Sequence, residues 1–267
     1  MPPRIPTAAD FAPLSSTLPH ALHFPSPPES TTAILILLHG LGDSHAPFAS
    51  FARAVNLPGV LAVSVRGTSR LPLDPRGDEE GEGEKGGFHW GDDVVVDQGT
   101  GGLDADPGFD RAEGLIMEKL VGEVLLGKCG WETSDIMFFG FGQGGSLGLG
   151  LASRLRASPR VVDVTDPSTK TGGGGGSDAA KRAFKGVVSI GGPLPASMVP
   201  TVSARQKSRT EVLLVQLDAE SVDAVRREFE HVRVVNWKRR EVAMPRDREE
   251  MFPIMKFFAD RLNSGWQ

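Results

Sequence analysis

The sequence alternates short, continuous apolar runs with segments whose apolar residues recur every three or four positions. Ala33–Leu38 (A-I-L-I-L-L) and Val60–Val65 (V-L-A-V-S-V) are apolar at nearly every position, which is typical of strands buried on both faces of a parallel sheet. Between Phe109 and Leu126, apolar residues recur every four positions with charges between them, which predicts a helix. The alternation predicts an α/β fold with a central, mostly parallel sheet and helices on both faces. The other expected elements are strands at Ile136–Phe139, Gly186–Ile190, Glu211–Leu217 and Val232–Lys238, and helices near Gln143–Arg156, Val222–Glu230 and Glu249–Leu262.

Three segments interrupt this alternation. Residues 1–30 contain eight prolines, which predicts an N-terminal arm or an added strand. Residues 74–87 are charged and glycine-rich, and residues 158–178 contain K-T-G-G-G-G-G-S, so we expect both to be flexible insertions. Because the strand after the second insertion is needed to complete the sheet, we expect one domain over residues 31–265.

The charge and composition exclude several classes of function. The net charge of −5 and the pI of about 5.7 leave no basic stripe for nucleic acid, and the short cluster Lys238–Arg240 is interpreted as a solvated loop. The single cysteine, Cys129, excludes an internal disulfide and fits a reducing compartment. No apolar run approaches the roughly 18–20 residues that span a bilayer. The N-terminal residues lack the pattern of a signal or transit peptide, so we expect a cytoplasmic protein.

Three motifs carry the candidate chemistry. L-L-H-G-L-G-D-S (Leu37–Ser44) follows the first predicted strand, F-H-W-G-D-D (Phe88–Asp93) lies in the middle of the chain, and G-F-G-Q-G-G-S (Gly140–Ser146) follows the apolar run D-I-M-F-F. Together they resemble the acyl-protein thioesterase and phospholipase/carboxylesterase family of α/β-hydrolases, whose strand-to-helix elbow reads G-F-S-Q-G-G. The resemblance covers most of the chain from about Ala33 onward and is specific in the first half. It implies an α/β-hydrolase fold of three layers around a mostly parallel sheet.

The resemblance implies an elbow without its nucleophile. The third position of the motif is Gly142, and glycine has no side chain to activate. Glycine does relieve a turn that costs other residues about 1–3 kcal/mol. The oxyanion hole is expected to survive, because its donors are the backbone N–H groups of Leu41 and Gln143. The resemblance also places further residues around the pocket: His39, which shapes the oxyanion loop, and Gly40, Asp43, His89 and Trp90.

The acid and the base of a catalytic triad are also in doubt. V-Q-L-D-A-E (Val215–Glu220) fits the family's acid segment best, with Glu220 at the acid position and Asp218 as a substitute. The family's histidine loop corresponds to E-V-A-M-P-R-D-R-E-E, with Pro245 or Arg246 near the expected place. No histidine follows His231 in the sequence.

Other side chains are weaker candidates. His231 precedes the strand Val232–Lys238 and is expected at the opposite edge of the sheet. Ser146 is interpreted as a helix-packing residue, Cys129 lies before a strand at the non-catalytic edge, and Ser189 ends a different strand. His89 remains an alternative candidate for the base. It would have to lie within hydrogen-bond reach of the proton that it removes.

The sequence predicts neither a metal nor a cofactor. The six histidines show no H-x-x-x-H or H-E-x-x-H spacing, and His20 and His23 lie in the proline-rich region. Asp92 and Asp93 could bind a cation weakly, but a polar loop turn is favoured. The glycine motif lacks the Lys-Ser/Thr of a P-loop and the spacing of G-x-G-x-x-G.

Two functions therefore remain. In the favoured one, the protein is a non-catalytic member of the family that binds an acyl-like small molecule, a partner protein, or both. In the other, it hydrolyses esters or thioesters with a non-standard site, in which water is held near Asp43, His89 and Glu220. The first is favoured because the nucleophile and the base are both missing, and such residues act as a unit.

Overall fold

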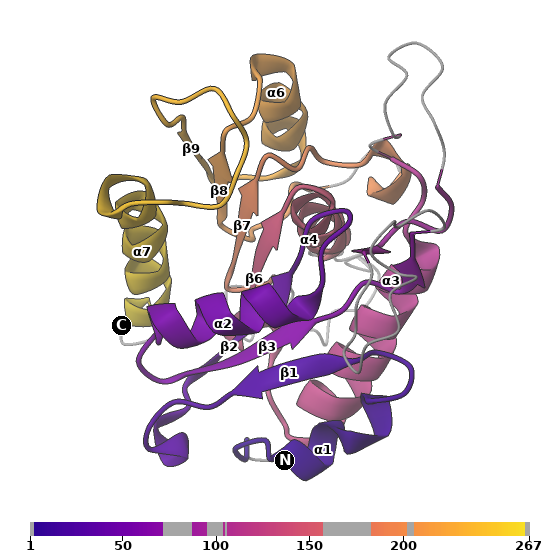
Figure 1. Cartoon of the computed structure of the whole chain (residues 1–267), viewed down its shortest axis with the longest axis vertical. Coiled ribbons are helices and arrows are strands. Elements are labelled where there is room, and N and C mark those ends of the chain that lie inside the picture. The colour runs from indigo at the N-terminus through magenta and orange to yellow at the C-terminus, as the bar shows by residue number, and fades with distance from the viewer. Residues whose placement is uncertain are drawn as a thin grey trace, which may run out of the picture.

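A computed structural model describes residues 3–71, 87–94, 104, 106–156, 183–201 and 206–264. Within these ranges, seven strands form one sheet of order β1-β3-β2-β6-β7-β8-β9 (Figure 1). All neighbours in it are parallel except β1, which runs antiparallel to β3. The strands are β1 (His20–His23), β2 (Ala33–Leu38), β3 (Val60–Val65), β6 (Ile136–Phe141), β7 (Gly186–Ile190), β8 (Val212–Val215) and β9 (Val232–Val235), with a separate pair β4 (Ser69–Arg70) and β5 (Phe88–His89).

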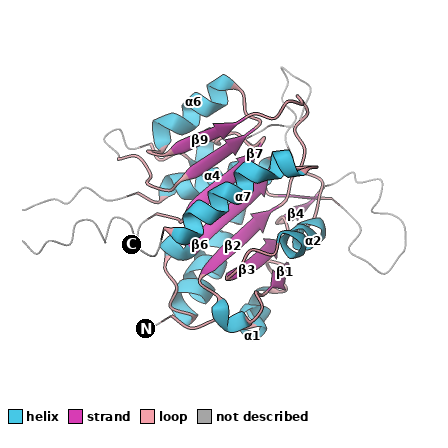
Figure 2. Ribbon diagram, turned by 90° about the vertical axis from the view of Figure 1, so that its left-hand side faces the viewer, coloured by secondary structure: helices cyan, strands magenta, loops and turns pink. Residues whose placement is uncertain are grey.

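Helices cover both faces of the sheet. Alternate residues of β2 point to opposite faces, so Ile36 and Leu38 join one buried cluster while Leu35 and Leu37 join the other. The second cluster lies under α2 and α7, which are in front of the sheet in Figure 2. The helices are α1 (Ala8–Phe11), α2 (His45–Val55), α3 (Asp110–Glu113), α4 (Gln143–Arg154), α6 (Ala219–Glu228) and α7 (Arg248–Asn263). Single 3₁₀ turns occur at Ala12–Leu14, Pro28–Ser30, Thr133–Asp135 and Ala196–Met198.

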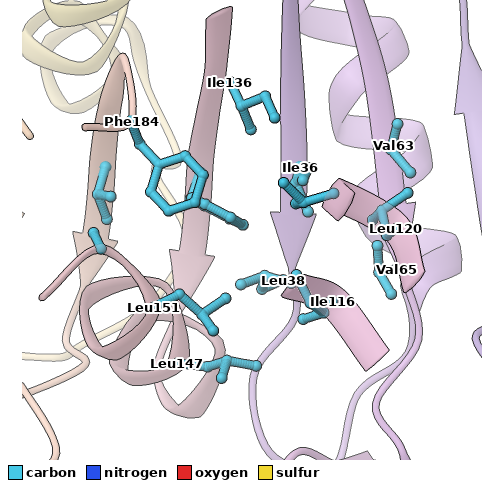
Figure 3. Packing of buried hydrophobic residues seen from close by; sticks show 14 of the residues in the cluster. Ile36, Leu38, Val63, Val65, Ile116, Leu120, Ile136, Leu147, Leu151 and Phe184 are labelled. Atoms are coloured by element: carbon cyan, nitrogen blue, oxygen red, sulfur yellow. The ribbon is translucent and has the colours of Figure 1, made fainter. Parts of the chain in front are cut away.

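A long helix behind the sheet fills the larger cluster. Helix α3 continues into Gly114–Lys128, which is wound as a π-helix; at its end the N–H of Cys129 donates to the carbonyl of Val124, five residues back. Ile116 and Leu120 from this segment pack near Leu38 and Val65 of the sheet (Figure 3). The helix predicted from Phe109 is therefore confirmed.

The N-terminal region forms the added strand, the second of the two alternatives for residues 1–30. Strand β1 pairs with β3 from His20 opposite Val65 to His23 opposite Ala62. Before it, the side chains of Phe11, Leu14 and Leu18 are buried in the larger cluster. Residues 3–30 are thus joined to the sheet by hydrogen bonds and by packing.

Most predicted elements are confirmed, with differences at their ends. The predicted strand Glu211–Leu217 was too long, because Gln216 adopts a left-handed conformation (φ 57°) that ends β8. Strand β9 ends at Val235, where the Gln216 side chain accepts the N–H of Trp237 at 2.6 Å. Helix α2 was not predicted. The predicted insertions 74–87 and 158–178 lie outside the described residues, except for Gly87. No helix in the described part of the chain is long and apolar enough to span a membrane.

Candidate functional site

The turn between β6 and α4 has the geometry of a nucleophile elbow. Gly142 lies between them with φ 50° and ψ −123°, a conformation that favours glycine strongly. Its N–H donates to the carbonyl of Ile190 at 2.8 Å, and its carbonyl accepts the N–H of Ser146 at 3.0 Å. The strained turn expected at this position is confirmed.

The three glycines of this turn differ in why glycine is favoured at their positions. A Cβ atom added to Gly140 would lie 2.3 Å from the carbonyl oxygen of Gly144, and one added to Gly144 would lie 2.3 Å from that of Leu38. At Gly142, by contrast, the nearest atom to an added Cβ would be the Cα of Gly40, at 3.9 Å. There is therefore room for a side chain at position 142, and only the backbone conformation there disfavours one.

The loop after β2 lies beside the elbow and is fixed by β5. The N–H of Gly42 donates to the carbonyl of Phe88 at 2.9 Å, and the N–H of Phe88 donates to the carbonyl of Asp43 at 3.0 Å. Within the described residues, no group accepts a hydrogen bond from the N–H of Leu41 or of Gln143. Because Gln143 opens α4, its N–H also lies at the positive end of the helix dipole. Among the described residues, neither of these two N–H groups has an acceptor.

His39 is a structural residue. Its ring is fully buried, and its Nε2 accepts the N–H of Gly67 at 2.7 Å. Its Nδ1 therefore carries the proton and donates to the carbonyl of Gly40 at 2.7 Å. Burial lowers the pKa of His39 to about 4, so the imidazole is neutral at physiological pH. Both ring nitrogens are used to shape the oxyanion loop.

Trp90 and Gln143 connect the three sequence motifs. The Oε1 atom of Gln143 accepts the backbone N–H of Trp90 at 2.8 Å. The indole Nε1 of Trp90 donates to the carbonyl of His39 at 2.8 Å, and the two rings lie 5.1 Å apart. The elbow, the Trp-containing segment and the oxyanion loop therefore form one hydrogen-bonded unit around Gly142.

His89 and Asp43 contribute mainly to this framework. The ring of His89 is buried near the backbone of Arg70 and Gly91, and burial lowers its pKa. The carboxylate of Asp43 accepts the N–H of Ser44 at 2.8 Å. These partners belong to the protein backbone.

The two candidate acids lie at the start of α6. Asp218 caps this helix, and its carboxylate accepts the N–H of Ser221 at 2.9 Å and the Ser221 hydroxyl at 2.8 Å. These hydrogen bonds lower the pKa of Asp218. Glu220 is exposed in the first turn of the helix. Asp218 is therefore engaged in capping.

The loop between β9 and α7 approaches the end of β7 through Val242. A Cβ added to Gly191, the residue after β7, would lie 2.1 Å from the Cγ1 atom of Val242. Pro245 is half-buried nearer to α7, and the N–H of the next residue, Arg246, donates to Glu250 at 3.0 Å. Sequence reasoning missed Val242, because the loop has no motif that fixes which of its residues turns toward the sheet.

The weaker candidates lie where the sequence suggested. Ser146 is buried in α4, and the hydroxyl of Ser189 donates to the carbonyl of Gly192 at 2.8 Å. His231 precedes β9 and Cys129 precedes β6, so both lie at the amino ends of the parallel strands, opposite the elbow. Burial raises the pKa of Cys129.

The described residues contain no group of three His, Cys, Asp or Glu side chains that could hold a metal ion. Asp92 instead caps α3, and its carboxylate accepts the N–H of Asp110 at 2.8 Å and that of Arg111 at 3.0 Å. The polar-turn interpretation of Asp92 thus agrees with its contacts.

Comparison with known proteins gives matches in sequence. A family model described as phospholipase/carboxylesterase matches residues 22–162. An uncharacterized hydrolase of Schizosaccharomyces pombe is 37% identical over 165 residues, which cover 62% of this chain and 55% of that protein. Another, of Mycosarcoma maydis, is 32% identical over 130 residues, which cover 48% of this chain and 44% of that protein. The chain thus spans about half the length of the curated relatives it matches.

Solved structures extend the likeness over nearly the whole chain. The esterase PE8 aligns with a TM-score of 0.61 at 14% identity, covering 91% of this chain and 99% of its own. Acyl-protein thioesterase 2 of Zea mays has a TM-score of 0.56 at 18% identity, with 91% and 98% covered. A Bacillus cereus carboxylesterase has a TM-score of 0.53 at 14% identity, with 94% and 98% covered. At such identities the likeness shows the fold, and the three-layer fold predicted from the sequence is confirmed.

Proposed function

Because the chain belongs to the phospholipase/carboxylesterase family of α/β-hydrolases, we propose that it is a non-catalytic member that binds an acyl-like ligand at the elbow without cleaving it. The observation that carries this proposal is Gly142, which lies at the nucleophile position in the strained backbone conformation of an elbow. A family member without a side chain at this position cannot form an acyl-enzyme there. A protein partner that inserts a carbonyl or carboxylate group is the other occupant that this site would accept.

The surroundings of Gly142 support loss of proton transfer. A serine hydroxyl needs an adjacent base at neutral pH. Asp218 is engaged in capping α6, His39 is neutral with both ring nitrogens bonded, and an apolar residue, Val242, packs against Gly191 after β7. The free N–H groups of Leu41 and Gln143 do not depend on any of these side chains, so they support ligand binding without chemistry.

Labelling and turnover test the absence of catalysis. The protein is expected not to label with a fluorophosphonate probe and not to hydrolyse p-nitrophenyl acetate above the buffer rate, with an active serine esterase as positive control. Stoichiometric labelling of any serine would contradict the proposal. Ester turnover without labelling would instead support a hydrolase with a non-standard site around Asp43, His89 and Glu220.

Titration with octanoate tests the ligand site. The variant Leu41→Pro removes one backbone donor, whereas Leu41→Ala keeps it and serves as the matched control. Loss of a hydrogen bond to a charged group should weaken binding by about ten-fold or more in Leu41→Pro. Equal affinity of the two variants would mean that octanoate binds elsewhere.

We also propose a cytoplasmic location, supported by the single, buried Cys129, which fits a reducing compartment. Fluorescence of a tagged chain in the cell checks this.

A further inference from the structure

The sheet order places the elbow between two loops of different character. The strand before the elbow, β6, lies between β2 and β7. The loop after β2 provides the oxyanion donor Leu41, so in acyl transfer the carbonyl oxygen would point to the β2 side. The proton of an attacking hydroxyl needs a base within hydrogen-bond reach, and the β7 side is the other neighbouring side of the elbow in the sheet.

Val242 is the side chain that occupies the β7 side. Gly191, which follows β7, has φ 67°, and the space where its side chain would lie is filled by the Cγ1 atom of Val242. The residue before it, Ile190, accepts the N–H of Gly142 at 2.8 Å. Val242 thus packs on the residue next to the one that accepts the Gly142 N–H, and 43% of its own surface is exposed.

The position of Val242 is fixed by its loop. The guanidinium of Arg239 donates to the carbonyl of Met244 at 2.8 Å and pairs with Glu250 at 2.9 Å. The carbonyl of Arg239 accepts from Gln216 Nε2 at 2.6 Å. Val242 lies between the two hydrogen-bonded residues Arg239 and Met244, whereas Pro245 follows them, next to the first turn of α7.

We propose that Val242 occupies the position from which a general base would serve residue 142, and that this apolar side chain closes the elbow to proton transfer. The assignment rests on the proposed function in one respect: it explains the absence of catalysis as the loss of both partners in one proton transfer. It also replaces Pro245, at which the sequence pattern had placed the base.

Rebuilding the pair tests this assignment. In Gly142→Ser/Val242→His, the introduced hydroxyl would add to the ester carbonyl and pass its proton to the neutral imidazole. The p-nitrophenolate would then leave, and water would release the acetyl group by the same proton transfer. A general base contributes roughly 10²–10⁴-fold, and without a partner acid we expect less than this range, at least about ten-fold over Gly142→Ser alone.

The pH profile separates a base from a structural effect. Because the imidazole must be neutral, p-nitrophenyl acetate turnover by Gly142→Ser/Val242→His should rise as the pH increases, with a midpoint at about pH 6.5. Matched controls place the histidine elsewhere, at Pro245→His and at the exposed Phe252→His, both in the Gly142→Ser background. Both controls are expected to stay at the rate of Gly142→Ser.

A gain with Pro245→His, or equal rates in all three folded double variants, would overturn the assignment. Should the serine variants fold poorly, Gly142→Cys gives a second readout, since an adjacent imidazole accelerates alkylation by iodoacetamide near neutral pH. Equal alkylation with and without Val242→His would count against the assignment as well. Turnover by the unchanged chain would overturn the proposed function alone, because the double variants are still compared above that background.

Discussion

At the scale of single residues, the three glycines of the elbow differ in what an added side chain would meet. Gly140 and Gly144 are required by close backbone contacts, but the position between them has open space. The turn can therefore be kept by its neighbours while the nucleophile position changes.

Substitution of Gly142 by alanine should destabilise the protein by about 1–3 kcal/mol, because a Cβ atom opposes its positive φ. The matched control is Gly114→Ala, at a helical position where an added Cβ meets no atom within 4 Å. That change should be neutral or stabilising by up to about 1 kcal/mol. Urea unfolding of both variants measures the difference, and an unchanged free energy for Gly142→Ala would contradict the strain.

His39 should make stability depend on pH. Its folded pKa of about 4 lies below the ordinary value of 6.5, so the unfolded chain binds a proton in this range before the folded chain does. Stability should therefore fall as the pH drops, by about 2–3 kcal/mol between about pH 7.5 and 4.5 from this group.

Unfolding of His39→Gln at both pH values checks this, because the variant should show a smaller pH dependence than the unchanged chain. His231→Gln, which removes an exposed histidine, is the control and should keep the full dependence. An equal loss of pH dependence in both variants would exclude His39 as the source.

At the scale of elements, a buried ion pair holds the loop from β9 to α7 in place. Arg239 and Glu250 are about nine-tenths buried, and the Arg239 guanidinium lies 4.7 Å from the Trp237 ring. These contacts fix a loop of irregular backbone against the first turn of α7. They help to set which residue of the loop packs against Gly191.

Neutralising Glu250 should therefore cost far more than neutralising its neighbour. Glu250→Gln leaves the buried guanidinium of Arg239 without its charge partner, and we expect a loss of about 2–4 kcal/mol. In Glu249→Gln the affected pair, with Lys238, is almost fully exposed, so little change is expected. Thermal and urea unfolding of both variants decide, and similar losses would mean that burial of the pair is unimportant.

At the scale of the whole molecule, the carboxyl ends of the parallel strands collect all three motifs at one edge. The oxyanion loop follows β2 and the elbow follows β6, and the Trp-containing segment that includes β5 is hydrogen-bonded to both. The N-terminal residues pack on the larger cluster and extend the sheet through β1, which pairs with β3. The fold thus depends on residues that carry none of the motifs.

Phe11→Ala should destabilise the protein by about 3–5 kcal/mol, because its ring is fully buried in the larger cluster. Phe252→Ala is the control, since this ring on α7 is 64% exposed and little change is expected. Chemical unfolding measures both. A small effect of Phe11→Ala would show that the N-terminal region is peripheral to the core.

The sequence by itself determined the sheet, its flanking helices and the identity of the elbow. Strands β2, β3 and β7 match their predicted ranges because buried parallel strands are continuous apolar runs. The positive φ of Gly142 followed from a motif whose function requires it. Both signals are local, so they can be read from neighbouring residues.

Only the tertiary structure decided the rest of the site. Val242 packs against Gly191, and Trp90 donates a hydrogen bond to Gln143; both contacts join residues that are distant in the chain. The free space at Gly142 likewise depends on a distant residue, since the nearest atom there belongs to Gly40. The commitment of Asp218 to a helix cap and the end of β8 at Gln216 depend on local conformations that the apolar pattern does not encode. The sequence shows that position 142 has no side chain, but which residue packs against Gly191 is set by a loop whose residues have no periodic signal.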